Sequence, residues 1–248
     1  MVRLHNVNRS FSLTEVLLAV GILAVGMIFI AGVFPAGIHF TTIATERSIA
    51  AVVADEAFAK IRLYGIDLSK LSGNKLENFN NDVLPATVDI DPNEFAYPST
   101  GTDITPKQYF WSALCGLVED DPNNRLVQVT VFVCRRVSPN LKYPDPDGIG
   151  TVNWPMPVPV DVSQGGKGNE LEIDGPDQIT FINDGYTIVD NETGRIYRVL
   201  ERYRDVPGTI LLDSDWEGSS PDTVWVVPPP VTGGRYPCIA VYQKVIRF

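Results

Sequence analysis

The chain contains 248 residues, with 30 acidic side chains against 20 Lys and Arg, and its formal net charge is −10 at pH 7. This acidity disfavours electrostatic binding of nucleic acid, which needs a basic surface, so we expect no nucleic-acid partner. The only histidines are His5 and His39, and the sequence has neither a Gly-x-Ser-x-Gly nor a phosphate-loop pattern. We therefore expect that the protein is not an enzyme.

A long apolar run near the N-terminus is the first predicted element. Residues 16–33 include no charged or strongly polar side chain, and as a helix they would be about 27 Å long, close to the hydrocarbon thickness of a bilayer. A secretory signal peptide is the main alternative, because Arg3 and Arg9 precede the run. A signal-peptide core usually has about 7 to 15 residues and ends at a cleavage site. Here the run is longer and leads into a second helical pattern, which favours a retained membrane-spanning helix.

The residues around this run follow an informative order. A short basic leader ends at Ser10, the stretch FSLTE (residues 11–15) follows, and the apolar helix begins directly after Glu15. This order resembles the N-terminus of type IV prepilins and type II secretion pseudopilins. The resemblance implies that a prepilin peptidase cuts between Ser10 and Phe11, N-methylates Phe11 and leaves the helix as a filament-assembly segment. It covers about the first 60 residues, and Ser10 stands where the family usually has Gly.

The same resemblance implies a location and a set of partners. The protein would be a single-pass inner-membrane protein with an extracytoplasmic C-terminal domain, either periplasmic or on a surface filament. Its partners would be other pilin or pseudopilin subunits, the prepilin peptidase, an inner-membrane assembly platform and the membrane itself. The chain then divides into a leader (1–10), a transmembrane and assembly helix (11–35), an amphipathic helix (36–65) and a β-rich domain (66–248).

Glu15 is the residue to which we assign assembly. An ionised carboxylate beside a membrane core costs several kcal/mol unless it finds a partner. If the mature chain begins at Phe11, its α-amino group lies four residues from Glu15, and in a bundle the amine of one subunit can pair with Glu15 of a neighbour. This pairing would set the axial register between subunits. The alternative is an ordinary acid at a helix N-terminus, in the headgroup region, favoured by the helix dipole.

A kink and a second helix are expected after the apolar run. Pro35 with Gly37 predicts a bend or break, because proline removes a backbone donor and crowds the preceding turn. Beyond it, Glu56 and Lys60 are spaced for an i,i+4 ion pair, and Gly65 ends the pattern as a helix cap. Apolar residues on one arc predict an amphipathic helix: Ile49, Ala50, Val53, Ala54, Ala57, Ile61 and Tyr64.

The remainder of the chain is predicted to be mostly β. The clearest strand is 126–137, with valines at 127, 129, 131 and 133 on one face and with both faces covered in part. Further strands are expected at 178–182, 186–189, 195–202, 209–212, 223–227 and 238–246, and an extended Pro/Gly-rich surface loop at 139–168. The predicted fold class is α+β, in which a long N-terminal helix packs on an antiparallel sheet with a long loop; the family resemblance implies the same pilin-like architecture.

Cysteines and acidic turns are the remaining candidate sites. Cys115, Cys134 and Cys238 have no metal-site spacing, and in an oxidising compartment one disulfide could form. We expect no cofactor. The acid-rich turns 119–124 and 145–150 are candidate Ca²⁺ sites, although the second fails the EF-hand pattern at Ile149 and at Met156; solvated turns are the default interpretation.

Three classes of function stay open at this level. The first, which we favour, is a structural and specialised or minor subunit of a type IV pilus or of a type II secretion pseudopilus. The second is a membrane-anchored or filament-tip binding module, an adhesin or cargo receptor, which an exposed aromatic patch around Trp154, Trp216 or Trp225 would support. The third is a membrane-tethered enzyme, which the absence of histidine after His39 disfavours.

Overall fold

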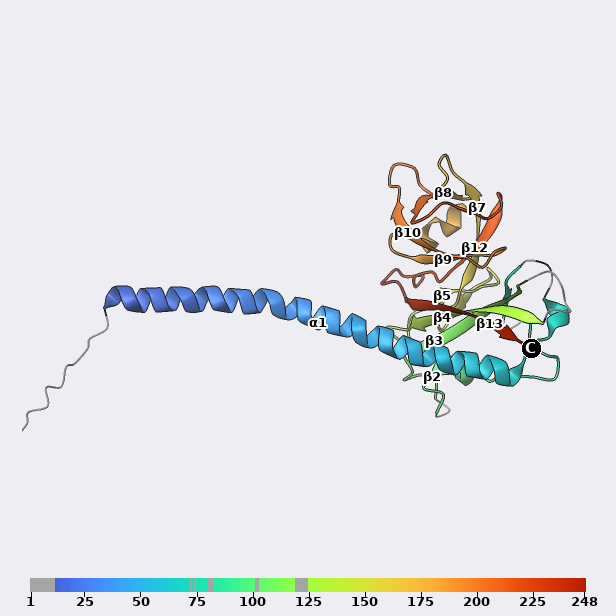
Figure 1. The fold of residues 1–248 in the computed structure, drawn as a ribbon, viewed down its shortest axis with the longest axis horizontal. Coiled ribbons are helices and arrows are strands. Elements are labelled where there is room, and N and C mark those ends of the chain that lie inside the picture. Colours follow the sequence, from blue (N-terminus) through green and yellow to red (C-terminus); the bar gives the residue numbers. More distant parts are fainter. Residues whose placement is uncertain (1–11, 72, 74, 80–82, 101–102, 119–124) are drawn as a thin grey trace, which may run out of the picture. The chain divides into compact units, whose positions relative to one another are not determined.

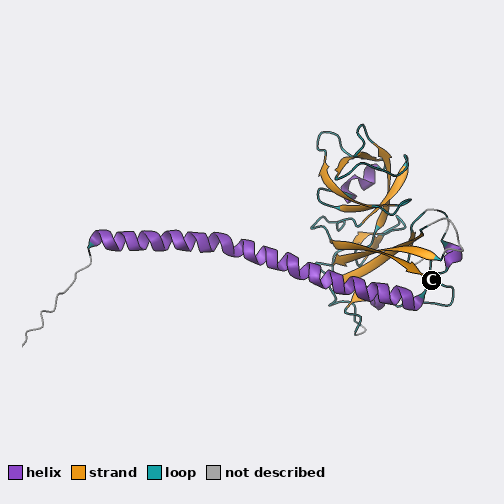
Figure 2. Cartoon of the chain, in the orientation of Figure 1, coloured by secondary structure: helices purple, strands orange, loops and turns teal. Residues whose placement is uncertain are grey.

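The computed structural model describes a single long helix, α1 (Leu13–Tyr64), followed by antiparallel β-structure, as the α+β prediction requires (Figure 2). The chain divides into two compact units, 1–46 and 47–248, so that α1 belongs to both. The residues described are 12–71, 73, 75–79, 83–100, 103–118 and 125–248.

Of the bend or break predicted at Pro35 with Gly37, the break is absent. Pro35 lies inside α1, and the ribbon passes through this region without interruption (Figure 1). Proline lacks only the backbone hydrogen bond that its own N–H would have donated to the preceding turn. The other backbone hydrogen bonds of the helix can still form, so the helix continues past Pro35. The Gly37 carbonyl accepts a further bond, 2.8 Å long, from the Thr41 hydroxyl. The second helical segment is therefore a continuation of the first.

The second half of α1 is amphipathic, as predicted. Ala50, Val53, Ala57 and Ile61 are fully buried in a cluster with one face of a β-sheet. The predicted Glu56–Lys60 ion pair forms at 2.9 Å, and Lys60 also contacts Glu94 at 2.8 Å. Gly65 ends the helix with φ +78°, a conformation that glycine adopts without strain, and its amide donates to the Ile61 carbonyl.

The sheet behind this half of α1 has five antiparallel strands. They are β1 (Glu77–Asn78), β2 (Ala96–Tyr97), β3 (Tyr109–Leu117), β4 (Leu126–Arg135) and β13 (Cys238–Arg247). The order is β1-β3-β4-β13, with β2 also paired to β3. The valines of β4 face α1, whereas Phe132 and Leu114 belong to a cluster on the other face. Both faces of β3 and β4 are thus covered, which explains their almost continuous burial.

A second group of strands closes into a barrel, drawn apart from the sheet strands in Figure 1. The strands are β7 (Val158–Gln164), β8 (Glu170–Ile173), β9 (Thr187–Asp190), β10 (Ile196–Arg202), β11 (Thr209–Leu212) and β12 (Asp222–Val226). Their order is β10-β11-β8-β7-β12-β9. Tyr197, Ile188, Val160 and other side chains fill the interior, so the barrel is a packed core.

The predicted surface loop at 139–168 is wrong in part. It contains a small hairpin of β5 (Tyr143–Pro144) and β6 (Thr151–Val152), and then β7 of the barrel. Proline is tolerated within β7 because of its position. Pro159 pairs with Trp225 of β12 on one side, and on the other side its carbonyl accepts a bond from a side chain, Gln178. The missing N–H of Pro159 lies on that second side, where no strand bond is lost.

The predicted strand at 178–182 is also wrong, since η3 (Pro176–Phe181) is a 3-10 helix. Pro176 is the first residue of η3, and proline is favoured at the start of a helix. Two other short 3-10 helices are η1 (Leu68–Lys70) and η2 (Pro92–Phe95). The predicted strand 126–137 corresponds to β4, which ends two residues earlier, at Arg135. The other predicted strands correspond to β9–β13 with bounds that agree within one residue.

The barrel is an insertion between two neighbouring strands of the sheet. β4 and β13 are paired along nine residues, yet the whole barrel lies between them in the chain. A third buried cluster joins the two modules, with Leu114 and Phe132 from the sheet beside Val189 and Val227 from the barrel segment. The bond from the Leu76 amide to the Asn191 carbonyl, 3.1 Å long, also connects them. Residues 47–248 therefore form one unit with two β modules.

The contact between α1 and the sheet yields the first testable prediction. Ile61 is fully buried, whereas Leu63, two residues further along the same helix, is 79% exposed. We expect Ile61→Ala to lower the free energy of unfolding by about 2–5 kcal/mol, because it leaves a cavity, and Leu63→Ala to change it by less than about 0.5 kcal/mol. Urea unfolding of the full chain in detergent micelles measures both, and equal losses would contradict this packing.

Candidate functional site

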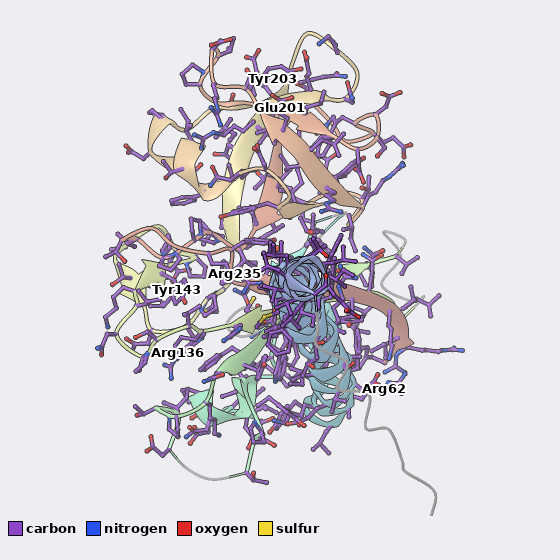
Figure 3. The ribbon with its side chains drawn as sticks, turned by 90° about the vertical axis from the view of Figure 1, so that its left-hand side faces the viewer. Arg62, Arg136, Tyr143, Glu201, Tyr203 and Arg235 are labelled. Atoms are coloured by element: carbon purple, nitrogen blue, oxygen red, sulfur yellow. The ribbon has the colours of Figure 1, made fainter. Side chains whose placement is uncertain are left out.

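The first half of α1 presents an unusual apolar surface. Between Leu13 and Phe40, sixteen large apolar side chains are 50–80% exposed. Figure 3 looks along α1 and shows side chains projecting around its whole circumference. Burying each such side chain is worth about 1.5–3 kcal/mol relative to leaving it in water. We name residues 13–40 the apolar half of α1.

This surface is too large and too continuous for a helix that stays in water. Soluble monomers rarely expose contiguous apolar patches above a few hundred Å², and a helix that is apolar all round is usually buried in protein or in a membrane. Among the described residues, α1 is the one helix long and apolar enough to cross a membrane. It could therefore act as a membrane anchor or as a signal sequence.

Three threonines after the apolar half satisfy their own hydroxyl groups. Thr41, Thr42 and Thr45 each donate a hydrogen bond of 2.8–2.9 Å to the carbonyl four residues earlier in α1. A hydroxyl bonded in this way needs no water, which lets a polar residue lie against lipid or another helix. A threonine inside a helical segment is the sequence signal for such a bond.

Glu15 occupies the first turn of α1. The Ser12 carbonyl accepts bonds from the amides of Val16 and Glu15, and the Ser12 hydroxyl lies 3.4 Å from the Glu15 amide. Ser12 is thus the N-cap and Glu15 the third helical residue, which is the spacing of a capping box. The Ser-x-x-Glu spacing of residues 12–15 is the sequence signal for this cap. Ser10 and Phe11, the predicted cleavage and methylation residues, lie outside the described residues.

The tryptophans do not gather into an exposed patch. Trp216 is only 7% exposed, and the Trp225 indole donates a 2.8 Å bond to Asn191. The Trp154 ring stacks on Phe110, with ring centroids 6.0 Å apart. Each of the three residues proposed for a binding surface is therefore engaged within the domain.

The candidate calcium turns gain no support from the described residues. The first turn, 119–124, lies outside them. In the second, the Asp145 carboxylate accepts a bond from the Asp147 amide, which is an ordinary Asx turn. No group of three His, Cys, Asp or Glu side chains placed to hold a metal occurs in the part of the chain that the structure describes.

Asp190 and Asp222 form a carboxyl pair on neighbouring barrel strands. Asp190 is fully buried, and its oxygens accept bonds from the amides of Glu192 and Thr193 and from the Thr193 hydroxyl. Burial, and then the nearby Asp190 and Glu192, raise the pKa of Asp222 to about 7. Paired carboxyls with separated pKa values can act as acid and base. Here the oxygens of Asp190 hold the turn after β9, which is a structural use.

An open groove of about 1080 Å³ lies beside η3. Its walls come from η3, from the loop 229–234 and from the β5–β6 hairpin, and they include Phe181, Tyr186, Asp177 and Arg202. The Arg202 guanidinium donates to the Ile179 carbonyl and to the Asn183 side chain, at 3.1 and 2.9 Å. The groove therefore combines aromatic walls with polar groups, some of which are already bonded.

No protein-family model, no curated protein and no solved structure matches this chain. Its function has to be inferred from its own residues.

The carboxyl pair yields a prediction of pH dependence. The unfolded Asp222 carboxyl releases its proton near its ordinary pKa of about 4, whereas the folded one holds it up to about pH 7. The stabilisation from this proton is therefore complete below pH 4 and is lost as the pH rises to 7. Asp190 and Glu192 face Asp222, and Asp161 lies on the neighbouring strand β7.

We expect Asp222→Asn to remove this part of the pH dependence. The thermal midpoint of the full chain would be measured from pH 4 to pH 7 for the wild type, for Asp222→Asn and for Asp205→Asn, which changes an exposed aspartate. The wild type and Asp205→Asn should lose more stability over this range than Asp222→Asn. Identical pH profiles for all three proteins would refute the raised pKa.

Proposed function

We propose that this protein is a pilin-like or pseudopilin-like structural subunit. In this proposal a prepilin peptidase cuts between Ser10 and Phe11 and methylates Phe11, and the mature protein assembles into a filament through α1. The domain of residues 47–248 would then be carried outside the cytoplasm. Type IV pilins and type II secretion pseudopilins share this kind of N-terminus, so the proposal covers both filament systems.

The single observation that carries the proposal is that one half of α1 is exposed and apolar, whereas the other half is packed into the core of the domain. The large side chains of the apolar half are 50–80% exposed, so they are accessible to lipid or to other helices. The other half buries Ala50, Val53, Ala57 and Ile61 in the core of the domain. A simple membrane anchor needs only the first half. A subunit that assembles through its N-terminal helix and carries a folded domain needs both halves.

Glu15 supports assembly over simple anchoring. It is the only carboxylate between Phe11 and Phe40, and it lies at the very start of the apolar half. An acid in a bundle of apolar helices is stabilised by pairing with an ammonium. The amine of a chain that begins at Phe11 supplies this ammonium, so neighbouring subunits would be placed in one register.

The capping-box geometry gives a sharp way to test this role. Glutamine serves at the third position of a capping box as glutamate does, but it cannot form an ion pair. We therefore expect Glu15→Gln to insert into the membrane at normal levels and to lower the fraction of protein in filaments at least about tenfold, or about 1.4 kcal/mol. The measurement is the amount of protein in sheared filaments relative to the membrane fraction of native cells.

Two matched variants complete the test. Glu15→Asp keeps the charge and should retain most incorporation, and Glu201→Gln, which changes an exposed barrel acid (Figure 3), should behave as the wild type. Unchanged incorporation of Glu15→Gln would rule out the pairing mechanism and leave Glu15 as a capping residue.

A membrane-anchored or filament-tip binding module, an adhesin or cargo receptor, is the second candidate. The groove beside η3 is the observation that favours it, since its walls include Phe181, Tyr186 and the polar groups of Asp177 and Arg202. The barrel that carries this groove is an insertion, which fits a displayed module added to a filament domain. Normal incorporation of a variant with a filled groove, together with loss of adhesion or secretion, would favour this candidate.

A further inference from the structure

Two of the three cysteines face each other across a pair of strands. All three cysteines are free and buried. Cys134 of β4 and Cys238 of β13 are direct partners in the antiparallel register, and both belong to the cluster between the sheet and the barrel. Cys115 belongs to the cluster on the opposite face, beneath α1. The fold therefore selects one pair out of the three that the sequence allows.

The local geometry suits a covalent bond between this pair. Directly opposed residues of antiparallel strands have Cα atoms about 4.5–5.5 Å apart, within the range of about 4.4–6.8 Å found for disulfides. The Cys238 thiol donates a hydrogen bond to the Ala240 carbonyl, 3.7 Å away. A register shift directly after Cys238 interrupts the ladder there, which gives the backbone room to adjust.

We propose that Cys134 and Cys238 form a disulfide bond in the exported protein. This inference rests on the proposed function, because disulfides persist in oxidising compartments outside the cytoplasm. The oxidant is a small-molecule or protein disulfide. The thiolate of one cysteine attacks it and releases a thiolate, and the second cysteine then displaces the other half of the oxidant. Two protons leave the cysteines, the two sulfurs join, and the oxidant is reduced to two thiols.

The bond would close the barrel segment at its base. Residues 135–237 lie between the two cysteines and include the β5–β6 hairpin and all six barrel strands. A bond at this point links the two ends of the insertion and restricts the unfolded chain over a long loop. Burial raises the pKa of the Cys134 thiol, so the reactive thiolate is scarce once the protein is folded. The bond is therefore made while the chain folds.

The test uses the full chain, so that folding and oxidation occur together. The protein is synthesised in a cell-free system with detergent micelles, either with dithiothreitol or with a mixture of oxidised and reduced glutathione. The protein is then unfolded in denaturant at low pH, free thiols are blocked with N-ethylmaleimide in the same denaturant, and the digested peptides are identified by mass spectrometry. In the oxidising mixture we expect most molecules to carry the Cys134–Cys238 link, with Cys115 blocked by the reagent.

Matched serine variants decide between specific and accidental oxidation. Cys115→Ser should still form the link and should unfold at a higher temperature when oxidised than when reduced. Cys134→Ser and Cys238→Ser should each show no such rise in the thermal midpoint. Blocked thiols at both Cys134 and Cys238 in oxidised wild-type protein, or a link that includes Cys115, would overturn the inference.

The same peptide mapping on protein from native cells separates this inference from the proposed function. A link that forms in both samples supports the disulfide and the location outside the cytoplasm. A link that forms only in the cell-free sample would overturn the extracytoplasmic location, and with it the modification in cells. A link absent from both samples would overturn the disulfide alone, because filament assembly through α1 does not depend on it.

Discussion

The exposed apolar half of α1 is the constraint on which the rest of the structure depends. Sixteen large apolar side chains from Leu13 to Phe40 are 50–80% exposed to water in the structure. Exposure of each side chain to water costs about 1.5–3 kcal/mol. Summed over all sixteen, this cost exceeds the net stability of a typical domain, so water cannot be their final environment. Lipid or neighbouring apolar helices would both shield them from water. The second half of the same helix is attached to the domain, because Ile61 and its neighbours are buried against the sheet.

The domain that α1 carries is built around strands covered on both sides. The valines of β4 pack beneath α1, and Phe132 packs toward the barrel. Because the barrel is inserted between the paired strands β4 and β13, both of its connections leave the sheet near one end of this pair, where Cys134 opposes Cys238. An insertion at such a point can grow into a packed barrel without disturbing the contact between the sheet and α1. Under the proposed function, α1 would be the assembling part and the barrel the displayed part.

The sequence predicted the parts of the fold whose signals are local. The arc from Ala50 to Ile61 and the cap at Gly65 follow from the 3.6-residue period and from glycine's freedom, and the valines of β4 follow from the two-residue period. Closure of the barrel depends on which distant strands pair, so no local pattern could indicate it. Strand β7 was not predicted because it contains Pro159, and proline fits in a strand only where its missing N–H faces a side without a strand bond. For the site, Glu15, the apolar run and the Ser-x-x-Glu spacing of residues 12–15 are all visible in the sequence, whereas the hydrogen bonds that make Ser12 the helix cap are seen only in the structure.

The central claim is that α1 is the mature N-terminal assembly segment of a processed subunit. Intact-mass measurement with N-terminal sequencing of the protein from its native membrane or filament fraction tests this claim most directly. The account predicts a chain that begins at N-methylated Phe11, which places a charged amine four residues from Glu15. A chain that begins at Met1 would contradict it and indicate a plain tethered domain. A chain that begins after Val33 would indicate a secreted protein that has lost the apolar helix.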